Sequence, residues 1–569
     1  MLVIALAVYV PMQADVAIAQ KPDTTQAALQ KADAAFRAGY AAMQAGKLQE
    51  ARQDFADTVA LAPQLPEAHV ALGAILVQLK RPEQAIPELE KALKLKPGDA
   101  TAVLNLVLAD EAIGKKLAVQ GKLADAEVQI QKGIAALSAL SSDAQGQDTV
   151  IAQAAELQDV LGSLLAQQKR WAEAETAFRE AMRIAPKEEA AAAHMHLGAV
   201  LLEEKQYDSA LVELNKAVES VPGNAMAQFQ LGRGLAAAGK DEEAVPHLEG
   251  ALKLAPALPG GVLELAMAEQ RLGKQAESIP IFERALVQEP NNAQTLTNLG
   301  LALTQTGKAK DAVPYLEHAL TVTPNDPVVH ENLGVAQLQQ SHFDEAIAQF
   351  EKARELDSTN PQLHYDLGLA YKLKDRMDDA IRELAEAAKL DPTLPDPPYT
   401  LGILYMQMGK LDDASVQLRA ALALRPSNGD GWAILGSVFK QMDKRDEAKD
   451  ALKKAIALLP NQPGPHVTLA AVLAEDGKHD EAAAERKIAA GLSRTAVNRQ
   501  RAMLNTNAGN QLLQRGAIAD AVEQYLEAIA ADPDYAEAHA QLAVAYTRQG
   551  RTNDAASERQ KADSLAKAN

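Results

Sequence analysis

Residues 293–326 read AQTLTNLGLALTQTGKAKDAVPYLEHALTVTPND, and residues 327–360 read PVVHENLGVAQLQQSHFDEAIAQFEKARELDSTN. The two blocks of 34 residues share one pattern of apolar residues, with a Leu-Gly pair at positions 7 and 8. Within each block the apolar residues fall at helical spacing in two segments, which a short polar stretch separates. Each block is therefore predicted to be a pair of antiparallel helices. The Leu-Gly pair recurs every 34 residues, with its glycine at Gly300, Gly334, Gly368, Gly402 and Gly436.

Two positions of the block carry small residues for a packing reason. Position 8 is Gly or Ala in nearly every block, and position 20 is Ala. Small side chains there let the backbones of the two helices approach where they cross. A Pro such as Pro324 or Pro426 ends most blocks, and because Pro cannot continue a helix the chain turns there into the next block. A two-helix unit cannot bury both apolar faces alone, so the blocks are expected to stack on one another.

This pattern resembles the tetratricopeptide repeat family, and the resemblance covers nearly all of the chain after residue 34. Position 20 is Ala in 14 of the 15 blocks that we count, and the exception is Ser278. The resemblance implies an all-α fold, a right-handed superhelical solenoid of antiparallel helical hairpins. Position 8 of the 15 blocks is occupied by Gly39, Gly73, Val107, Gly162, Gly198, Gly232, Ala266, Gly300, Gly334, Gly368, Gly402, Gly436, Ala470, Gly509 and Ala543.

Breaks in the repeat define the expected boundaries. The third block has about seven extra residues, which predicts an elongated first helix. Gly491–Arg501 lacks a closing Pro and lies where the spacing grows to 39 residues, so we place a joint there. Arg559 replaces the Leu or Phe of position 24 and predicts a solvent-facing cap. The expected division is a signal peptide at 1–19, a linker at 20–33, repeats 1–3 at 34–140, a loop at 141–152, repeats 4–13 at 153–493, and repeats 14–15 with the cap at 494–569.

The first 19 residues have the pattern of a secretory signal. Leu2–Val10 form an apolar run too short to span a bilayer, and residues 17–19, Ala-Ile-Ala, have the small-x-small form of a signal-peptidase site. No Lys or Arg precedes Lys21, so the usual basic segment is missing. We predict export to the periplasm or the medium with cleavage near Ala19, and the alternative is a cytoplasmic protein whose first helix stays attached. No other stretch approaches the ~18 apolar residues of a membrane helix.

Composition and motifs argue against several classes of protein. Lys and Arg number 57 against 76 Asp and Glu, so a nucleic-acid binder, which needs surplus positive charge, is not expected. The chain has no cysteine, which excludes disulfides, thiol nucleophiles and Cys-ligated metals. No motif of a catalytic nucleophile, metalloprotease, phosphate loop or dinucleotide site occurs, so we predict no catalytic, cofactor or metal site. Histidines that share position 4 with Trp432 are interpreted as packing residues: His69, His194, His330, His364, His466 and His539.

The remaining candidate site is the groove. In the family, the first helices of the blocks line the concave side, and positions 5, 9 and 12 are among those that contact ligands. In this chain position 9 is mostly apolar from the sixth block to the twelfth, position 5 includes tyrosines, and position 12 includes lysines. This predicts an apolar, Tyr-bearing strip with basic edges. The predicted partner-binding residues are Arg233, Met267, Leu301, Tyr365, Leu369, Lys372, Tyr399, Ile403, Met406 and Lys440.

These features predict a non-enzymatic scaffold that binds polypeptide segments of partner proteins in its groove. Analogy with exported bacterial proteins of the family suggests a place in the cell envelope. Two alternatives stay open: a cytoplasmic adaptor, and an accessory subunit of a glycosyltransferase or polysaccharide-export system. The apolar residues at position 9 have a second interpretation as well, which is packing against the neighbouring block.

Overall fold

The computed structural model describes residues 24–185 and 190–568, and every element in these ranges is a helix. The chain divides into two compact units, Met1–Gly307 and Lys308–Asn569. The N-terminal unit contains α1 (Thr24–Gln44), α2 (Leu48–Leu61), α3 (Pro66–Gln78), α4 (Pro82–Leu95), α5 (Ala100–Val119), α6 (Leu123–Ser138), α7 (Ser142–Gln145), α8 (Asp148–Gln167), α9 (Trp171–Ile184), α10 (Ala191–Glu203), α11 (Tyr207–Ser220), α12 (Ala225–Ala237), α13 (Asp241–Leu254), α14 (Gly261–Arg271), α15 (Gln275–Gln288) and α16 (Ala293–Gln305). The C-terminal unit contains α17 (Ala309–Val322), α18 (Pro327–Gln339), α19 (Phe343–Leu356), α20 (Pro361–Leu373), α21 (Met377–Leu390), α22 (Asp396–Gln407), α23 (Leu411–Leu424), α24 (Gly429–Gln441), α25 (Arg445–Leu458), α26 (Pro463–Glu475), α27 (His479–Gln514), α28 (Ile518–Ala531), α29 (Ala536–Arg548) and α30 (Thr552–Ala568).

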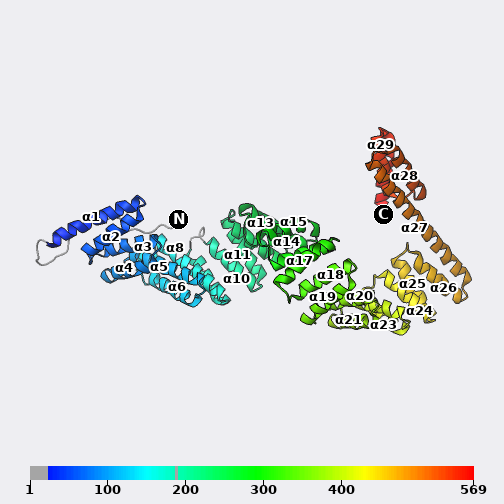
Figure 1. The fold of residues 1–569 in the computed structure, drawn as a ribbon, viewed down its shortest axis with the longest axis horizontal. Coiled ribbons are helices and arrows are strands. Elements are labelled where there is room, and N and C mark those ends of the chain that lie inside the picture. The colour runs from blue at the N-terminus through cyan, green and yellow to red at the C-terminus, as the bar shows by residue number, and fades with distance from the viewer. Residues whose placement is uncertain (1–23, 186–189, 569) are drawn as a thin grey trace. The chain divides into compact units, whose positions relative to one another are not determined.

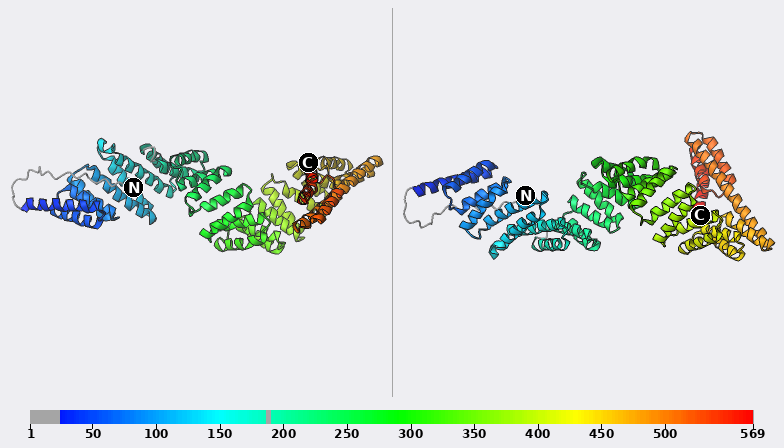
Figure 2. Two further views of the ribbon diagram at one scale, coloured as in Figure 1. Left: turned by 90° about the horizontal axis from the view of Figure 1, so that it is seen from above. Right: turned by 60° about the horizontal axis from the view of Figure 1, so that its bottom comes forward.

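Within each unit a helix packs on the helices that precede and follow it. Substantial contacts join helices that are adjacent or separated by one other helix, and in one case, α5 with α8, by α6 and the short α7. Figures 1 and 2 show this succession along the ribbon. Because each hairpin contacts mainly its neighbours, the described chain is an all-α solenoid of antiparallel helical hairpins, as the repeat predicts.

The turn inside each hairpin has one residue in the left-handed region of backbone conformation. This residue stands at position 15 of every block but the third, where the extra residues shift it to Gly121, and in the 15 blocks nine are Gly and six are Lys, Ser or Asp. The next N–H donates to a carbonyl five residues earlier, as Arg376 N does to Tyr371 O at 2.9 Å, which is the Schellman pattern that ends a helix. These turns confirm the count of 15 hairpins. The residues are Gly46, Lys80, Gly121, Lys169, Lys205, Gly239, Gly273, Gly307, Ser341, Asp375, Gly409, Asp443, Gly477, Gly516 and Gly550.

Position 8 lies where the two helices of a hairpin come closest. A Cβ added to Gly368 would stand 2.8 Å from Leu384 Cγ, and one added to Gly162 would stand 2.6 Å from Phe178 Cε1. In every hairpin for which such a contact is recorded, the side chain met is the one at position 24, sixteen residues further on. Carbon atoms cannot approach so closely in a packed interior. The predicted packing reason for glycine at position 8 is therefore confirmed.

Two of the expected boundaries are wrong, and one expected feature is confirmed. The expected linker at 20–33 is helical from Thr24 onward, while the predicted signal peptide at 1–19 lies outside the described residues. The expected loop at 141–152 is largely helical, because the hydroxyl of Ser141 caps α7 and α8 begins at Asp148. The elongated first helix of the third block is confirmed, since α5 has 20 residues.

The expected joint at Gly491–Arg501 is an unbroken helix. α27 has 36 residues and combines the second helix of block 13 with the first helix of block 14, so the expected boundary after residue 493 falls inside it. The missing Pro that suggested a joint is the reason, because a segment without Pro or a left-handed residue has nothing to end its helix. Most side chains between residues 491 and 501 are exposed. The cap prediction is confirmed, because Arg559 of α30 is exposed.

Candidate functional site

The predicted strip lies on the first helices of consecutive hairpins in the C-terminal unit. Tyr365 and Leu369 belong to α20, while Tyr399, Ile403 and Met406 belong to α22, and all five are half-buried. Tyr365 packs against the apolar cluster of α19 to α22, and Tyr399 and Met406 pack against the cluster of α23 to α26. These five residues, called the apolar strip below, thus combine packing with a partly open surface.

Lys372 and Lys440 stand at the expected basic edge, near the C-terminal ends of α20 and α24. Both side chains are half-buried. Lys440 Nζ lies 3.8 Å from Glu475 Oε1, so a carboxylate already neutralises part of its charge. Within the described part of the chain, no carboxylate oxygen lies in ion-pair distance of Lys372 Nζ. Lys372 is therefore available to an acidic group of a ligand.

Two carboxyls that were not among the predicted site residues lie toward the N-terminal ends of α18 and α20. Glu331 of α18 and Asp366 of α20 hold positions 5 and 6 of adjacent hairpins and are half-buried. Asn360 Nδ2 donates to Glu331 Oε2 at 3.0 Å, and Gln362 Nε2 donates to Asp366 Oδ1 at 3.1 Å. Burial raises the pKa of Glu331, and burial together with the charge of Glu331 raises the pKa of Asp366 to about 7. Neutral amides are thus their polar partners.

Charged groups also surround the Tyr365 ring. Arg425 donates to the two carboxylate oxygens of Asp396 at 3.0 and 3.1 Å, so these two side chains neutralise each other. Burial raises the pKa of the Tyr365 phenol, the hydrogen bond with Thr400 lowers it, and the charges of Asp396 and Asp366 raise it further. The phenol is therefore a neutral polar group near the ion pair of Arg425 and Asp396.

The other three predicted residues lie in the N-terminal unit. Arg233 of α12 stands between Glu203 Oε1 at 3.8 Å and Glu264 Oε1 at 3.9 Å. The three side chains line an open cavity of about 310 Å³, and burial raises the pKa of Glu264 although Arg233 opposes the shift. Met267 of α14 and Leu301 of α16 are half-buried. The predicted residues of this unit thus include Arg233, whose charge is compensated by two glutamates, so they form no purely apolar strip.

The position-4 histidines do more than fill space, because they bridge the two helices of their hairpins. His364 Nδ1 lies 2.7 Å from Glu383 Oε2, and His364 Nε2 lies 3.1 Å from the carbonyl oxygen of Ser358. Arg354 Nη1 also donates to Glu383 Oε1 at 2.6 Å, and the Glu383 side chain is buried. Seven hairpins have such a pair between positions 4 and 23: His69–Glu88, His194–Glu213, Gln228–His247, His330–Gln349, His364–Glu383, His466–Glu485 and His539–Glu558.

Sequence reasoning missed these bridges, although their constant spacing of 19 residues is a signal that could have found them. At His69, His364 and His539 the two ring nitrogens face a carboxylate and a backbone carbonyl. Each ring therefore has a polar partner at both of its nitrogens, one on the second helix of the hairpin and one on the backbone. Their role is structural. In residues 24–185 and 190–568 no three potential ligands gather as a metal site.

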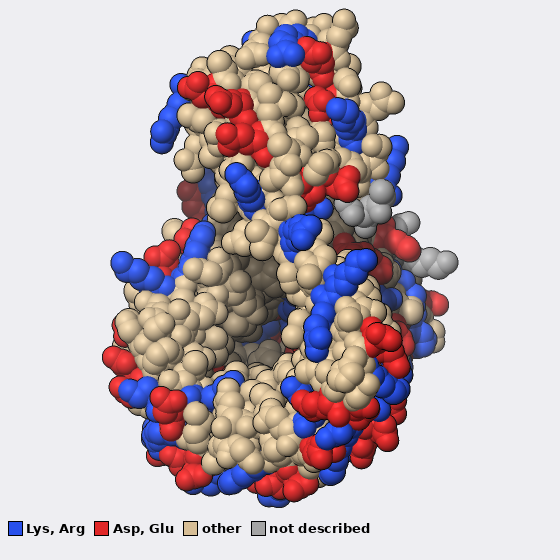
Figure 3. All heavy atoms as spheres, turned by 90° about the vertical axis from the view of Figure 1, so that its right-hand side faces the viewer, with Lys and Arg blue, Asp and Glu red and all other residues tan. Residues whose placement is uncertain are grey.

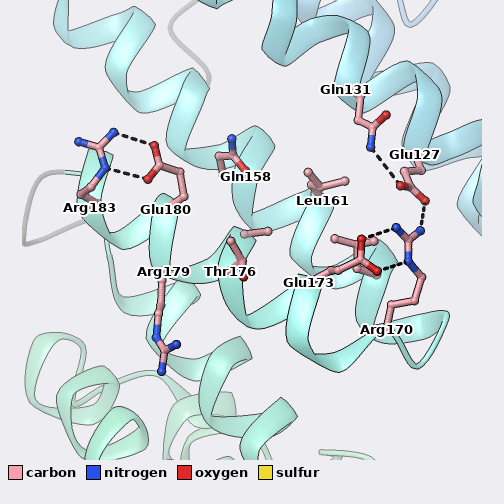
Figure 4. A pocket seen from close by; sticks show the side chains of 12 residues that line it. Glu127, Gln131, Gln158, Leu161, Arg170, Glu173, Thr176, Arg179, Glu180 and Arg183 are labelled. Carbon is pink, nitrogen blue, oxygen red and sulfur yellow. Dashed lines mark hydrogen bonds and ion pairs between the residues drawn. The ribbon is translucent and has the colours of Figure 1, made fainter.

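A groove opens in the N-terminal unit where this bridge is missing. Gln158 and Ala177 hold positions 4 and 23 of the α8–α9 hairpin, and a groove of about 760 Å³ runs over α8 between α6 and α9 (Figure 4). Leu161 on its floor is half-buried, whereas every other leucine at position 7 is buried. The floor of the groove thus includes a partly uncovered apolar side chain. Ion pairs along the rim neutralise one another: Arg170–Glu127, Arg170–Glu173 and Arg183–Glu180.

The charged surface is mixed in sign. Figure 3 shows acidic and basic side chains interspersed over the face that it presents. No extended positive surface of the kind that binds a phosphate backbone is visible on that face. Among the helices that the structure describes, none is both long and apolar enough to cross a membrane.

Comparison with known families identifies the repeat. Family models described as tetratricopeptide repeat or TPR repeat match segments that together cover more than half of the chain. The chain therefore belongs to the tetratricopeptide repeat family. The matched segments are residues 36–100, 165–231, 205–259, 292–359, 332–395, 374–438, 429–462 and 509–550.

Several solved structures are similar to parts of this chain, whereas no protein of curated function matches it. MamA (41-end) from Desulfovibrio magneticus RS-1 is 23% identical over 30% of this chain and 95% of its own, with a TM-score of 0.28. YrrB, described as a TPR protein with an unusual peptide-binding site, is 23% identical over 35% and 97%, with a TM-score of 0.29. A human IFIT1 dimer with PPP-AAAA is 17% identical over 75% and 91%, with a TM-score of 0.35.

Proposed function

We propose that the chain is a non-enzymatic scaffold that binds a polypeptide segment of a partner protein along the apolar strip. The observation that carries this proposal is the half-burial of five large side chains on α20 and α22, whereas other residues of the same helices, such as Leu367 and Leu401, are buried. Tyr and Met are favoured at protein interfaces because they offer large contact area and adapt their shape. Apolar surface concentrated on adjacent helices is the expected mark of a contact site.

The repeat architecture explains how such a strip binds. Each hairpin is held by its own interior, so the strip exists before the partner arrives and little ordering is required of the scaffold. The partner, an extended segment or a helix, loses most of the conformational freedom. Affinity then depends on how many side chains of the partner fill the spaces between Tyr365, Leu369, Tyr399 and Ile403.

A peptide selection tests the proposal. Random peptides displayed on phage are selected on the full-length protein, and the Kd of each selected peptide is then measured. Replacement of both tyrosines, Tyr365→Ala with Tyr399→Ala, is expected to weaken binding by ~2 kcal/mol or more while helicity stays unchanged. Val416→Ala is the control, because Val416 of α23 is 61% exposed away from the strip and should have no effect. If the peptides bind the double variant as tightly as the wild-type protein, the binding site lies elsewhere on the protein.

The cellular location is part of the same proposal. The apolar run Leu2–Val10 and the small residues at 17–19 support export to the cell envelope, although the segment lies outside the described residues. N-terminal sequencing of the mature protein tests this point. A first residue at Gln20 is expected, and a mature chain that retains residues 1–19 would favour a cytoplasmic adaptor.

A further inference from the structure

Glu331 and Asp366 are half-buried carboxyls beside the apolar strip, and we call this pair the carboxyl recess. The two side chains come from adjacent first helices, α18 and α20, and both are half-buried. Asp366 lies three residues before Leu369, so both residues are on one side of α20. Tyr365 directly precedes Asp366 in the chain, and the charge of Asp366 raises the pKa of the Tyr365 phenol. The recess and the strip are therefore parts of one surface.

The recess lacks the cation that other buried carboxyls have. Five described carboxyls have a pKa raised by burial, and three of them have a basic side chain in ion-pair range: Asp110 with Lys132, Glu111 with Lys115, and Glu264 with Arg233. Within the described residues, Glu331 and Asp366 have only the amides of Asn360 and Gln362 as side-chain partners. Arg425 lowers the pKa of Tyr365 through its charge, but its guanidinium is already paired with the carboxylate of Asp396.

This arrangement is unfavourable in the chain alone. Two carboxyls of like charge share a partly desolvated place, and each disfavours the ionised form of the other. Carboxyls whose pKa is shifted by burial and by a like charge are concentrated at functional sites. A cation placed between the two carboxylates would form charge-assisted hydrogen bonds with both.

The surroundings select the form of that cation. The Tyr365 ring provides an aromatic face for an ammonium or guanidinium group. Leu369 and Val335, half-buried residues of α20 and α18, provide apolar surface for the methylene stem of a long side chain. A hydrated metal ion would gain nothing from this apolar surface, whereas lysine and arginine side chains combine both properties.

We propose that the carboxyl recess binds a lysine or arginine side chain of the partner segment, whose apolar neighbours lie on the apolar strip. This inference rests on the proposed function, since it specifies the chemistry of the segment that the strip binds. It commits to an apolar polypeptide segment with at least one basic residue.

The test uses the peptides selected on the full-length protein and a norleucine analogue of each, in which the basic residue keeps its methylene stem and loses its charge. The basic peptide is expected to bind the wild-type protein at least about tenfold more tightly than its analogue. Asp366→Asn and Glu331→Gln should each remove most of that difference, because they replace a carboxylate by an amide of the same shape. Asp413→Asn, at an exposed carboxylate of α23, makes the same charge change elsewhere and should preserve the difference.

Each of the following results would overturn the inference. If the selected peptides show no enrichment of Lys or Arg, or if their norleucine analogues bind equally well, the recess does not recognise a positive charge. In either case, loss of binding in the tyrosine double variant would still support the strip as the binding site. Peptides whose affinity changes neither in the tyrosine double variant nor in the Asp366→Asn and Glu331→Gln variants would refute the proposed function itself. Titration of the peptide-free protein with CaCl₂ separates a metal site, because calcium binding that Asp366→Asn abolishes would assign the recess to a metal ion.

Discussion

Leu367, Gly368 and Leu369 are consecutive residues of α20, yet they have different surroundings. Leu367 is 0% exposed in the apolar interior, and Gly368 has no room for a Cβ against Leu384. Leu369, one residue further, is half-buried on the strip. Because an α-helix turns by about 100° per residue, neighbours in sequence face different parts of the structure. One face of each first helix therefore builds the hairpin, and the other face is free to acquire a function.

Two carboxyls of the same hairpin repeat this contrast. Glu383 of α21 is buried between His364 and Arg354, and each of its two carboxylate oxygens has one of them as a partner. The charge of Glu331 raises the pKa of Asp366 of α20, and among the described residues the amide of Gln362 is the side-chain partner of Asp366. The interior carboxylate is a structural element, whereas the strip carboxylate costs stability. The predictions below alter the interior face, the exposed face or the turn of such a hairpin, and each change should mainly affect the feature that it alters.

The largest loss is expected from Glu383→Ala. The change leaves the buried His364 ring and the half-buried Arg354 guanidinium without their acceptor, and removal of one partner from a buried ion pair costs roughly 3–5 kcal/mol. Because an array of repeats opens in parts, the measurement is hydrogen exchange of α20 and α21 rather than one global melting curve. Glu386→Ala on the same helix is the control, since Glu386 pairs with Lys389 at the surface and should cost less than about 1 kcal/mol. Equal effects of the two changes would contradict the structural role of the bridge.

A matched pair of leucines tests the contrast between the faces. Leu367→Ala is expected to destabilise the hairpin by roughly 3 kcal/mol, because it opens a cavity in a closed interior. Leu369→Ala removes the same atoms from a half-open surface and should cost less than about 1 kcal/mol. Hydrogen exchange compares their stabilities, and peptide affinity should show the reverse order, with the larger loss at Leu369. A large stability loss at Leu369 would mean that the strip mainly packs.

Features that depend on one hairpin could be predicted from the sequence. The helix pairs, the close approach at Gly368 and the elongated α5 follow from local rules of spacing and side-chain size. The joint at Gly491–Arg501 was predicted wrongly, because the absence of Pro was taken as a break when it permits α27 to continue. The loop after Leu140 failed in a similar way, since polar residues such as Ser141 also cap helices.

Features that depend on two helices were harder to predict. The bridge from His364 to Glu383 joins positions 4 and 23, and neither residue is informative until the two helices are placed side by side. The carboxyl recess joins different hairpins, so its charge could not be read along one column of the repeat. The apolar strip was predicted by the family pattern, and its residues are half-buried, but its binding role stays a prediction.

A smaller, pH-dependent effect is expected from Asp366→Asn. The folded chain raises the pKa of Asp366 to about 7, above an unfolded value of about 3.9, so folding favours the protonated acid. Ionisation then costs stability progressively as the pH rises from about 4 to about 7. Asn cannot ionise, so the variant should match the wild type near pH 4 and be more stable by roughly 2 kcal/mol near pH 8. Thermal melting at both pH values measures the difference, and a variant that is less stable near pH 8 would refute the cost assigned to this carboxylate.

The smallest effect is expected in the turn, which belongs to neither face. Asp375 ends α20 in the left-handed region, with φ at 57°, a conformation that costs a residue with a Cβ but not glycine. Asp375→Gly should therefore stabilise the α20–α21 hairpin by about 0.5–1 kcal/mol, and the reverse change Gly409→Asp should destabilise the next hairpin by a similar amount. Hydrogen exchange measures both. Because the side chain at this turn position belongs neither to the recess nor to the strip, peptide affinity should stay the same in both variants. Altered affinity with unchanged contacts would mean that hairpin stability and binding are coupled, so the two faces of α20 could no longer be treated as independent.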